Sequence, residues 1–146
     1  MQILVDSREQ SPLKFKSDTI TDVITTKLNV GDYGCKFKDG FSPPVFFERK
    51  ALGDLFSTLT SGYKRFKKEI LRAGETNTQL ILIIEGTLSK VLNGTKYCRV
   101  EGKTIVKTIF TLWVKYNLIP VFCKDRTEMS RFITEYYEGL GRNAKR

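Results

Sequence analysis

The chain has 146 residues, of which 40% are hydrophobic, and this content is enough for the buried core of one domain. Lys and Arg number 25 against 16 Asp and Glu, and the net charge of +9 favours nucleic acid, or less commonly an anionic membrane surface, as a partner. No apolar run approaches the roughly 18 residues that span a membrane, and a strand-like stretch follows Met1 where a secretion signal needs an apolar helix, so we expect a soluble, intracellular protein with no membrane partner.

The first predicted elements are a strand and a short helix. Residues 2–5 are apolar and β-branched, which predicts a buried strand that ends at the polar cluster 6–9. Ser17 or Asp18 can then cap a short helix, because apolar residues follow at near-helical spacing. These apolar residues are Ile20, Val23, Ile24 and Leu28.

A hairpin is predicted next. The strand-like runs 33–37 and 45–50 flank a turn at residues 38–40, and two prolines loosen the connecting loop. Glu48 and Lys50 lie on the second strand of this hairpin.

The following residues alternate between helical and extended patterns. A helical pattern covers residues 54–59 and resumes over 63–72 after a Ser-Gly pair. Residues 80–85 form a continuous aliphatic run, which is typical of a central strand covered on both faces. An amphipathic helix is predicted over 105–116, and a further short strand over 119–123.

A last helix and a short tail complete the chain. Asp125 and Glu128 form a capping-box pattern before this helix. Its apolar side is formed by Met129, Phe132, Ile133 and Tyr136. We expect one domain over residues 1–141 and a basic tail over 142–146. Because strands and helices alternate in the second half and a hairpin lies in the first, the predicted class is α/β, with a mixed central β-sheet flanked by helices.

The composition also restricts the chemistry of any catalytic site. The chain has no histidine, so the usual zinc ligand and the usual general base are both missing. A metal ion must therefore be bound by oxygen, and carboxylate and carbonyl ligands favour Mg²⁺ or Mn²⁺. Cys35, Cys98 and Cys123 lack C-x-x-C spacing and are expected to be reduced thiols.

Three charged residues form the candidate catalytic group. Glu48 and Lys50 are two residues apart on one strand, so their side chains project to the same face. Asp32 begins the strand expected to pair with this one, which could bring both carboxylates to one divalent ion. Lys50 would hold a water molecule or stabilise charge on the phosphate beside that ion. The arrangement predicts a hydrolytic site built without histidine.

A simpler interpretation exists for residues 48–50. An isolated Glu-x-Lys triplet is more commonly a solvated run on an edge strand. Here the triplet follows the apolar run 45–47, and buried strands seldom end in three charges without a pocket or partners there. This context favours a functional site.

These residues resemble the XPF-type structure-specific endonucleases, a branch of the PD-(D/E)XK nuclease superfamily. The motif of that family is G-D, a variable stretch and then E-R-K-x-x-x-D, and it is matched here by Gly31-Asp32 and by residues 48–54, ERKALGD. An upstream V-D-x-R-E is matched by residues 5–9, and the later elements follow in family order. The resemblance covers nearly the whole chain and implies a restriction-endonuclease-like fold.

The resemblance also implies roles for individual residues. It makes Asp32 and Glu48 metal ligands and Lys50 the catalytic lysine, with Glu9 as a further contact to the metal or to metal-bound water. The implied supporting members of the site are Arg8, Glu9, Arg49 and Asp54. Two carboxylates keep a second interpretation, because Asp6 could cap the turn after its strand and Asp54 could be the N-cap of the next helix.

A basic surface is predicted on the helix over residues 63–72. Lys64, Lys68 and Arg72 repeat every four residues and form one stripe, with Arg65 and Lys67 on neighbouring faces. An ordinary solvated helix face has the same pattern, but the high total charge favours contact with the DNA backbone.

Together these features predict a Mg²⁺- or Mn²⁺-dependent endonuclease that cuts one strand of branched duplex DNA, such as a flap, fork or junction. The alternatives are a non-cleaving protein that binds branched DNA or acts as a scaffold, and a generic nuclease acting on linear duplex or RNA. The resemblance implies a homodimer, for which the apolar last two helices could supply the interface.

Two further expectations concern organisation and location. Family members usually carry a helix-hairpin-helix module after the nuclease domain, and none follows here, so we expect a stand-alone nuclease or one that borrows DNA-binding surface from another subunit. The compartment would be the cytoplasm in a bacterium or virus and the nucleus in a eukaryote.

Overall fold

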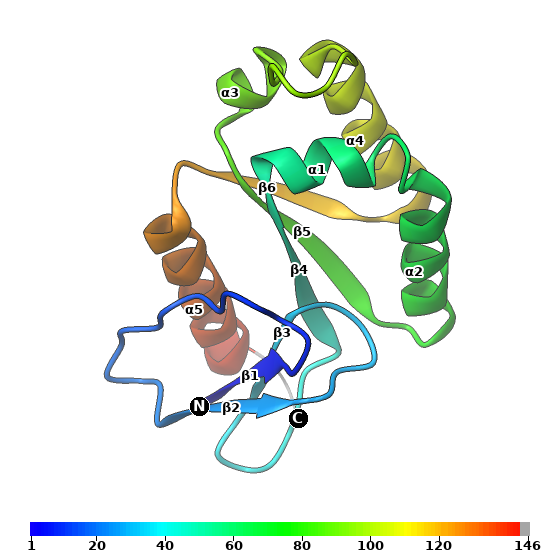
Figure 1. Ribbon diagram of the computed structural model, residues 1–146. Helices are drawn as coiled ribbons and strands as arrows, with labels where there is room; N and C mark the ends of the chain where they lie inside the picture. Colours follow the sequence, from blue (N-terminus) through cyan, green and yellow to red (C-terminus); the bar gives the residue numbers. More distant parts are fainter. Residues whose placement is uncertain (144–146) are drawn as a thin grey trace.

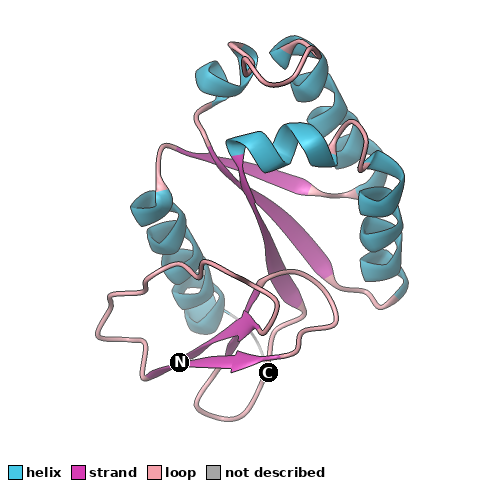
Figure 2. Ribbon diagram, viewed as in Figure 1, coloured by secondary structure: helices cyan, strands magenta, loops and turns pink. Residues whose placement is uncertain are grey.

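The computed structural model describes residues 1–143 and shows a single sheet with helices on both faces (Figures 1 and 2). The strands are β1 (Gln2–Asp6), β2 (Asp22–Thr26), β3 (Tyr33–Lys36), β4 (Val45–Ala51), β5 (Gln79–Glu85) and β6 (Ile119–Cys123). The helices are α1 (Leu52–Thr58), α2 (Tyr63–Glu75), α3 (Leu88–Leu92), α4 (Gly102–Tyr116) and α5 (Arg126–Asn143). None of these helices is long and apolar enough to cross a bilayer.

The sheet is mixed, in the order β2-β1-β3-β4-β5-β6. β3 is antiparallel to both of its neighbours, whereas β1 and β2 are parallel, and so are β4, β5 and β6. The predicted class, α/β with a mixed central sheet, is confirmed. Because β4, β5 and β6 are parallel, their carboxyl ends meet at one edge of the sheet, and Glu48 and Lys50 lie near that edge.

Two hydrophobic cores sandwich the sheet. On one face α5 places Met129, Ile133 and Tyr137 against alternate residues of β1, β3, β4 and β5. On the other face α1, α2 and α4 cover the opposite set of side chains, including Leu82 and Ile84 of β5. Since both faces of β5 are covered, its continuous aliphatic run is explained, as predicted.

The helix predicted from Ser17 or Asp18 is wrong, because this part of the chain forms the edge strand β2 instead. β2 pairs in parallel with β1, and the flanking backbone bonds Thr21 N–H to the Met1 carbonyl and Ser7 N–H to the Thr26 carbonyl extend the pairing. The run Val-Ile-Thr-Thr is β-branched and its residues are mostly exposed. The near-helical spacing of the apolar residues therefore did not indicate a buried helix face. These residues form a strand because β-branched side chains favour extended backbone and because the edge of β1 is available for pairing.

The last helix begins close to its predicted start. The Asp125 carboxylate accepts a hydrogen bond from the Glu128 N–H at 2.8 Å, while Glu128 reaches the N–H of Lys124 at 3.0 Å, one residue earlier than a regular capping box. Tyr137 is fully buried on its inner face, and Tyr136 is only partly buried. Of the predicted tail 142–146, residues 142–143 belong to α5, and residues 144–146 lie outside the described part of the chain.

Candidate active site

Asp32 is held between β1 and β4 by its own backbone. Its N–H donates to the Phe47 carbonyl at 2.7 Å, and its carbonyl accepts from the Asp6 N–H at 2.8 Å. The preceding Gly31 has a φ of +74°, and a Cβ there would lie 3.0 Å from the Phe47 carbonyl oxygen. A glycine before Asp32 is therefore required by both the left-handed backbone and the close approach to β4.

The structure brings Asp32, Glu48 and Lys50 together. Glu48 and Lys50 project from the same face of β4, with the Lys50 Nζ 3.6 Å from the Glu48 Oε2. The Asp32 and Glu48 carboxyl groups lie close enough for each to influence the pKa of the other, and the backbone N–H of Arg49 donates to the Asp32 Oδ2 at 2.8 Å. The three side chains thus converge where β3 begins and β4 approaches its end.

Burial makes the two carboxyl groups costly to ionise. Desolvation, followed by the negative charge of Asp32, raises the pKa of Glu48 to about 8, because the ammonium of Lys50 offsets only part of these effects. Desolvation and the charge of Glu9 also raise the pKa of Asp32, against the N–H of Arg49, which lowers it. Two neighbouring carboxylates beside a single ammonium have a net negative charge when both are ionised, and a bound cation would neutralise it. This all-oxygen pair suits a hard divalent cation such as Mg²⁺ or Mn²⁺.

Arg49 points to the opposite face of β4 and binds Glu9. Its Nε and Nη2 reach the two Glu9 oxygens at 3.1 and 3.2 Å, a bidentate pair, and its Nη1 lies 3.9 Å from Glu85. Within residues 1–143 no group of three or more His, Cys, Asp or Glu residues is arranged to hold a metal ion. Glu9 is the partner of Arg49, and its charge affects Asp32. Its contact with a metal or with metal-bound water stays a prediction.

Asp6 caps the turn after β1, as the sequence suggested. Its carboxylate accepts from the N–H of Leu28 at 2.9 Å, and from the N–H of Arg8 and the Arg8 guanidinium. The Arg8 side chain also donates to the Leu28 carbonyl at 3.0 Å. Asp6 and Arg8 together therefore fasten the chain that leads from β2 towards Asp32.

Asp54 is not the N-cap of α1, so that interpretation is wrong. The N-cap position is held by Ala51. Asp54 lies exposed in the first turn, where its negative charge interacts favourably with the helix dipole. Its carboxylate makes no hydrogen bond or ion pair with any residue between 1 and 143.

The basic residues of α2 divide into two groups. Lys64, Arg65 and Lys68 line a hollow of about 750 Å³ together with Lys50. Lys67 instead lies with its Nζ 5.3 Å from the Tyr116 ring centroid, and the Arg72 guanidinium donates to the Asn29 carbonyl at 2.9 Å. The basic surface beside the catalytic group is therefore narrower than the stripe expected from the sequence.

Sequence reasoning missed two carboxylates near the site. Glu69 of α2 lines the same hollow as Lys50, and its charge contributes to the raised pKa of Glu48. Its position four residues after Arg65, on one helix face, was the available signal. Glu85, which ends β5, faces Arg49 because β5 pairs with β4, and only the strand register reveals this contact.

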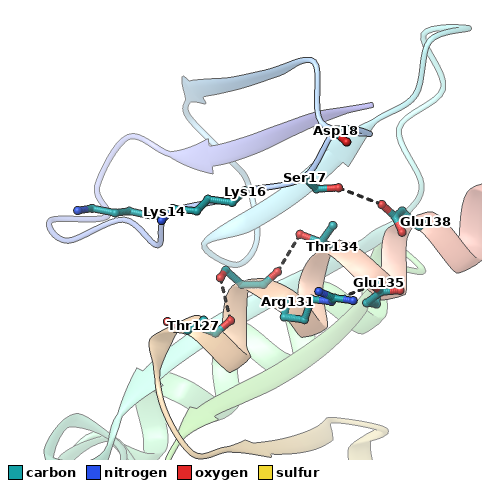
Figure 3. A pocket seen from close by; sticks show the side chains of 10 residues that line it. Lys14, Lys16, Ser17, Asp18, Thr127, Arg131, Thr134, Glu135 and Glu138 are labelled. Carbon is teal, nitrogen blue, oxygen red and sulfur yellow. Dashed lines mark hydrogen bonds and ion pairs between the residues drawn. The ribbon is translucent and has the colours of Figure 1, made fainter.

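A second hollow, of about 840 Å³, lies between residues 14–18 and α5, on the other face of the sheet (Figure 3). Several of its charges are already paired, because Glu138 accepts from Ser17 and Arg131 binds Glu135 at 2.9 Å. It does not contain the predicted catalytic residues.

Comparisons with known proteins agree with this geometry. The model of the ERCC4 domain family matches residues 5–136. XPF from Aeropyrum pernix superposes with a TM-score of 0.72 at 20% identity, covering 98% of this chain and 66% of that chain. A second structure, XPF from Aeropyrum pernix in complex with DNA, gives a TM-score of 0.70 at 21% identity, covering 99% of this chain and 68% of that one.

The chain thus spans about two thirds of the length of the archaeal protein. None of the curated proteins matches its sequence. The structural likeness confirms the predicted restriction-endonuclease-like fold, and the family match includes all three residues of the candidate catalytic group. The resemblance drawn from the motifs is confirmed, and the chain belongs to the ERCC4 domain family.

Proposed function

We propose that the protein is a metal-dependent endonuclease that hydrolyses a phosphodiester bond in one strand of branched DNA. The observation that carries the proposal is the convergence of Asp32, Glu48 and Lys50 beside the basic hollow of α2. Burying two neighbouring carboxyl groups costs free energy, which points to a functional role for the pair. A pair of this kind beside a cationic surface is suited to phosphate chemistry.

Each residue of the catalytic group has a distinct role in this proposal. Asp32 and Glu48 hold a Mg²⁺ or Mn²⁺ ion, which when bound supplies Lewis-acid polarisation of a phosphate and activation of water. Lys50 donates hydrogen bonds to the attacking water or to the phosphate as negative charge develops. Arg49 keeps Asp32 in place through its backbone N–H, and its side chain holds Glu9.

DNA as the substrate is supported by charge and by likeness. The net charge is +9, and Lys64, Arg65 and Lys68 surround the approach to Lys50. The archaeal XPF protein of the same fold has been seen in complex with DNA. A preference for flaps, forks or junctions follows from the resemblance to structure-specific endonucleases.

Cleavage assays with labelled flap, fork and four-way junction DNA test the proposal. With Mg²⁺ or Mn²⁺ the protein should cut one strand, EDTA should abolish cutting, and Asp32→Asn should reduce the rate by at least about 100-fold, as loss of a dominant electrostatic contribution does. DNA binding by the variant, measured in EDTA, should persist. Binding without cutting by the unaltered protein would instead identify a non-cleaving branched-DNA-binding protein. Cutting of linear duplex or RNA at the same rate would identify a generic nuclease.

The proposal includes a homodimer that uses the C-terminal helices. α4 presents Phe110, Trp113 and Val114 at the surface, with exposed fractions of 39%, 40% and 85%. Clustered exposed apolar side chains of this kind are typical of a protein contact surface.

A further inference from the structure

A third hollow adjoins the basic hollow along α1. Its volume is about 440 Å³, within the roughly 300–1,000 Å³ common for small-ligand sites. Leu52, Gly53 and Phe56 of α1 form one wall, and residues 94–98 form the other. Leu52 follows Lys50 by two residues, so this apolar pocket begins directly after the catalytic strand.

Ser57 connects the two spaces. It lines both the apolar pocket and the basic hollow that contains Lys50. Because the two spaces meet at Ser57, one DNA strand could contact both of them.

The chemistry of the pocket wall suits a nucleobase. The Tyr97 side chain is 90% exposed, although a large aromatic ring is usually covered, and the Lys96 Nζ lies 5.8 Å from its ring centroid. Exposed aromatic rings paired with cations are what proteins use to stack unpaired bases and hold the adjoining phosphate. Arg99 and Lys103 add positive charge to the same segment, against the single acid Glu101.

We propose that this pocket, between α1 and residues 94–98, binds an unpaired nucleobase from a single-stranded arm of the DNA substrate. The inference rests on the proposed function, because it assigns to that function a part of the substrate. A base within a duplex is stacked on both faces and cannot enter, so the pocket distinguishes DNA with a single-stranded arm from blunt duplex.

A thiol inside the pocket permits a test that does not depend on cleavage. Cys98 lines the pocket and is partly exposed, whereas Cys35 and Cys123 are buried, which raises their pKa values to about 12 and about 11. Iodoacetamide should therefore modify Cys98 selectively. Mass spectrometry would follow the rate in EDTA, with Cys98→Ser as the control for the labelling site.

Forked DNA with a single-stranded arm should slow the labelling of Cys98 by at least about fivefold, the smallest effect expected from one stacked base. Blunt duplex of the same length, at a concentration giving equal occupancy, should leave the rate nearly unchanged. Equal protection by both DNAs, or none by the fork, would overturn the inference.

Two substitutions test the pocket directly. Tyr97→Ala should weaken binding of the fork by at least about fivefold while Tyr97→Phe retains it, since stacking needs only the ring. Gly53→Leu should have the same effect as Tyr97→Ala, because a Cβ at Gly53 meets nothing within 4 Å and the added side chain would extend into the pocket. Gly74→Leu, on α2 and equally open at its Cβ, is the matched control.

The remaining outcomes are also decisive. If Gly53→Leu alters self-association in sizing measurements but not binding of the fork, the pocket is a protein contact and the inference is wrong. Protection of Cys98 without any cleavage by the unaltered protein would support the inference and contradict the nuclease proposal. Cleavage of forks without protection of Cys98 would support the nuclease proposal and contradict the inference.

Discussion

At the scale of single residues, the site is fixed by backbone constraints more than by side-chain contacts. Gly31 allows the chain to turn against β4, and the two backbone bonds of Asp32 set its carboxylate beside Glu48. The backbone N–H of Arg49 then holds that carboxylate at 2.8 Å. The sequence motif G-D followed by E-R-K thus has a structural reason in addition to its proposed catalytic one.

Replacement of Gly31 tests this reason. Gly31→Ala should lower the free energy of unfolding by about 2 kcal/mol or more, because the Cβ adds a 3.0 Å contact with the Phe47 carbonyl oxygen to the strain of a positive φ. Gly40→Ala is the control, since Gly40 has a φ of +87° but open space around it, and it should cost only about 1 kcal/mol. Urea unfolding measures both, and equal losses would show that the close approach to β4 is unimportant.

The raised pKa of Glu48 predicts a pH dependence of stability. Between its ordinary value of 4.5 and its folded value of about 8, the folded protein binds a proton more tightly than the unfolded chain does. The free energy of unfolding of the metal-free protein should therefore fall as the pH rises through this window. Glu48→Gln should flatten the fall. Urea unfolding in EDTA at several pH values between 5 and 8 measures this effect, and stability that rises with pH in the unaltered protein would contradict it.

At the scale of elements, α1 and α2 organise the proposed DNA-binding surface. α2 follows β4 and α1 closely, and its packing residues Phe66 and Ile70 fix which of its basic side chains face Lys50. Helical spacing identified the basic face but could not identify its neighbours. The position of α4 decides that Lys67 meets Tyr116 while Lys68 faces the hollow.

Two adjacent lysines on α2 test this assignment. Changing either Lys67 or Lys68 to alanine removes one positive charge. An effect of net charge alone therefore predicts the same change in the salt dependence of DNA binding for both variants. We expect Lys68→Ala to reduce the slope of log K against log salt by about 0.9, the value for one phosphate contact, and Lys67→Ala to leave it nearly unchanged. Fluorescence anisotropy with fork DNA at several salt concentrations measures the slopes. Equal slopes for the two variants would show that the basic surface is broader than the hollow.

At the scale of the whole molecule, the sheet separates the helix α5 from the proposed functional surfaces. α5 and its core stabilise one face, whereas the catalytic group, the basic hollow and the apolar pocket all lie around the carboxyl ends of the parallel strands or on the α1 and α2 side. α4 lies on that side as well (Figure 1), and its exposed apolar residues are where the proposed homodimer would form.

Self-association is tested on α4. Val114→Glu should shift the protein from dimer to monomer, because it places a charge in the proposed contact, and the side chain is 85% exposed, so folding should be little affected. Thr104→Glu makes the same charge change at another exposed position of α4 and should leave the dimer intact. Sedimentation velocity measures the change. A monomer in the unaltered protein would contradict the proposed homodimer.

The sequence by itself determined the class of the fold and the central members of the site. Local sequence patterns can be recognised without knowing which residues meet in the folded structure. They predicted the aliphatic strand β5, the hairpin of β3 and β4, and the placement of Glu48 and Lys50 on one face. The motif also predicted that Asp32 would join them, and the structure places it there.

Only the tertiary structure decided what depends on contacts between distant segments. β2 is a strand because the edge of β1 is open to it, whereas apolar spacing alone indicated a helix. Glu9 binds Arg49, Glu69 affects Glu48, and Lys67 turns away from the hollow, because the register of the sheet and the packing of α2 and α4 set these neighbours. Local sequence encodes on which face of a strand or helix a side chain lies. Tertiary packing determines which other residues that face contacts.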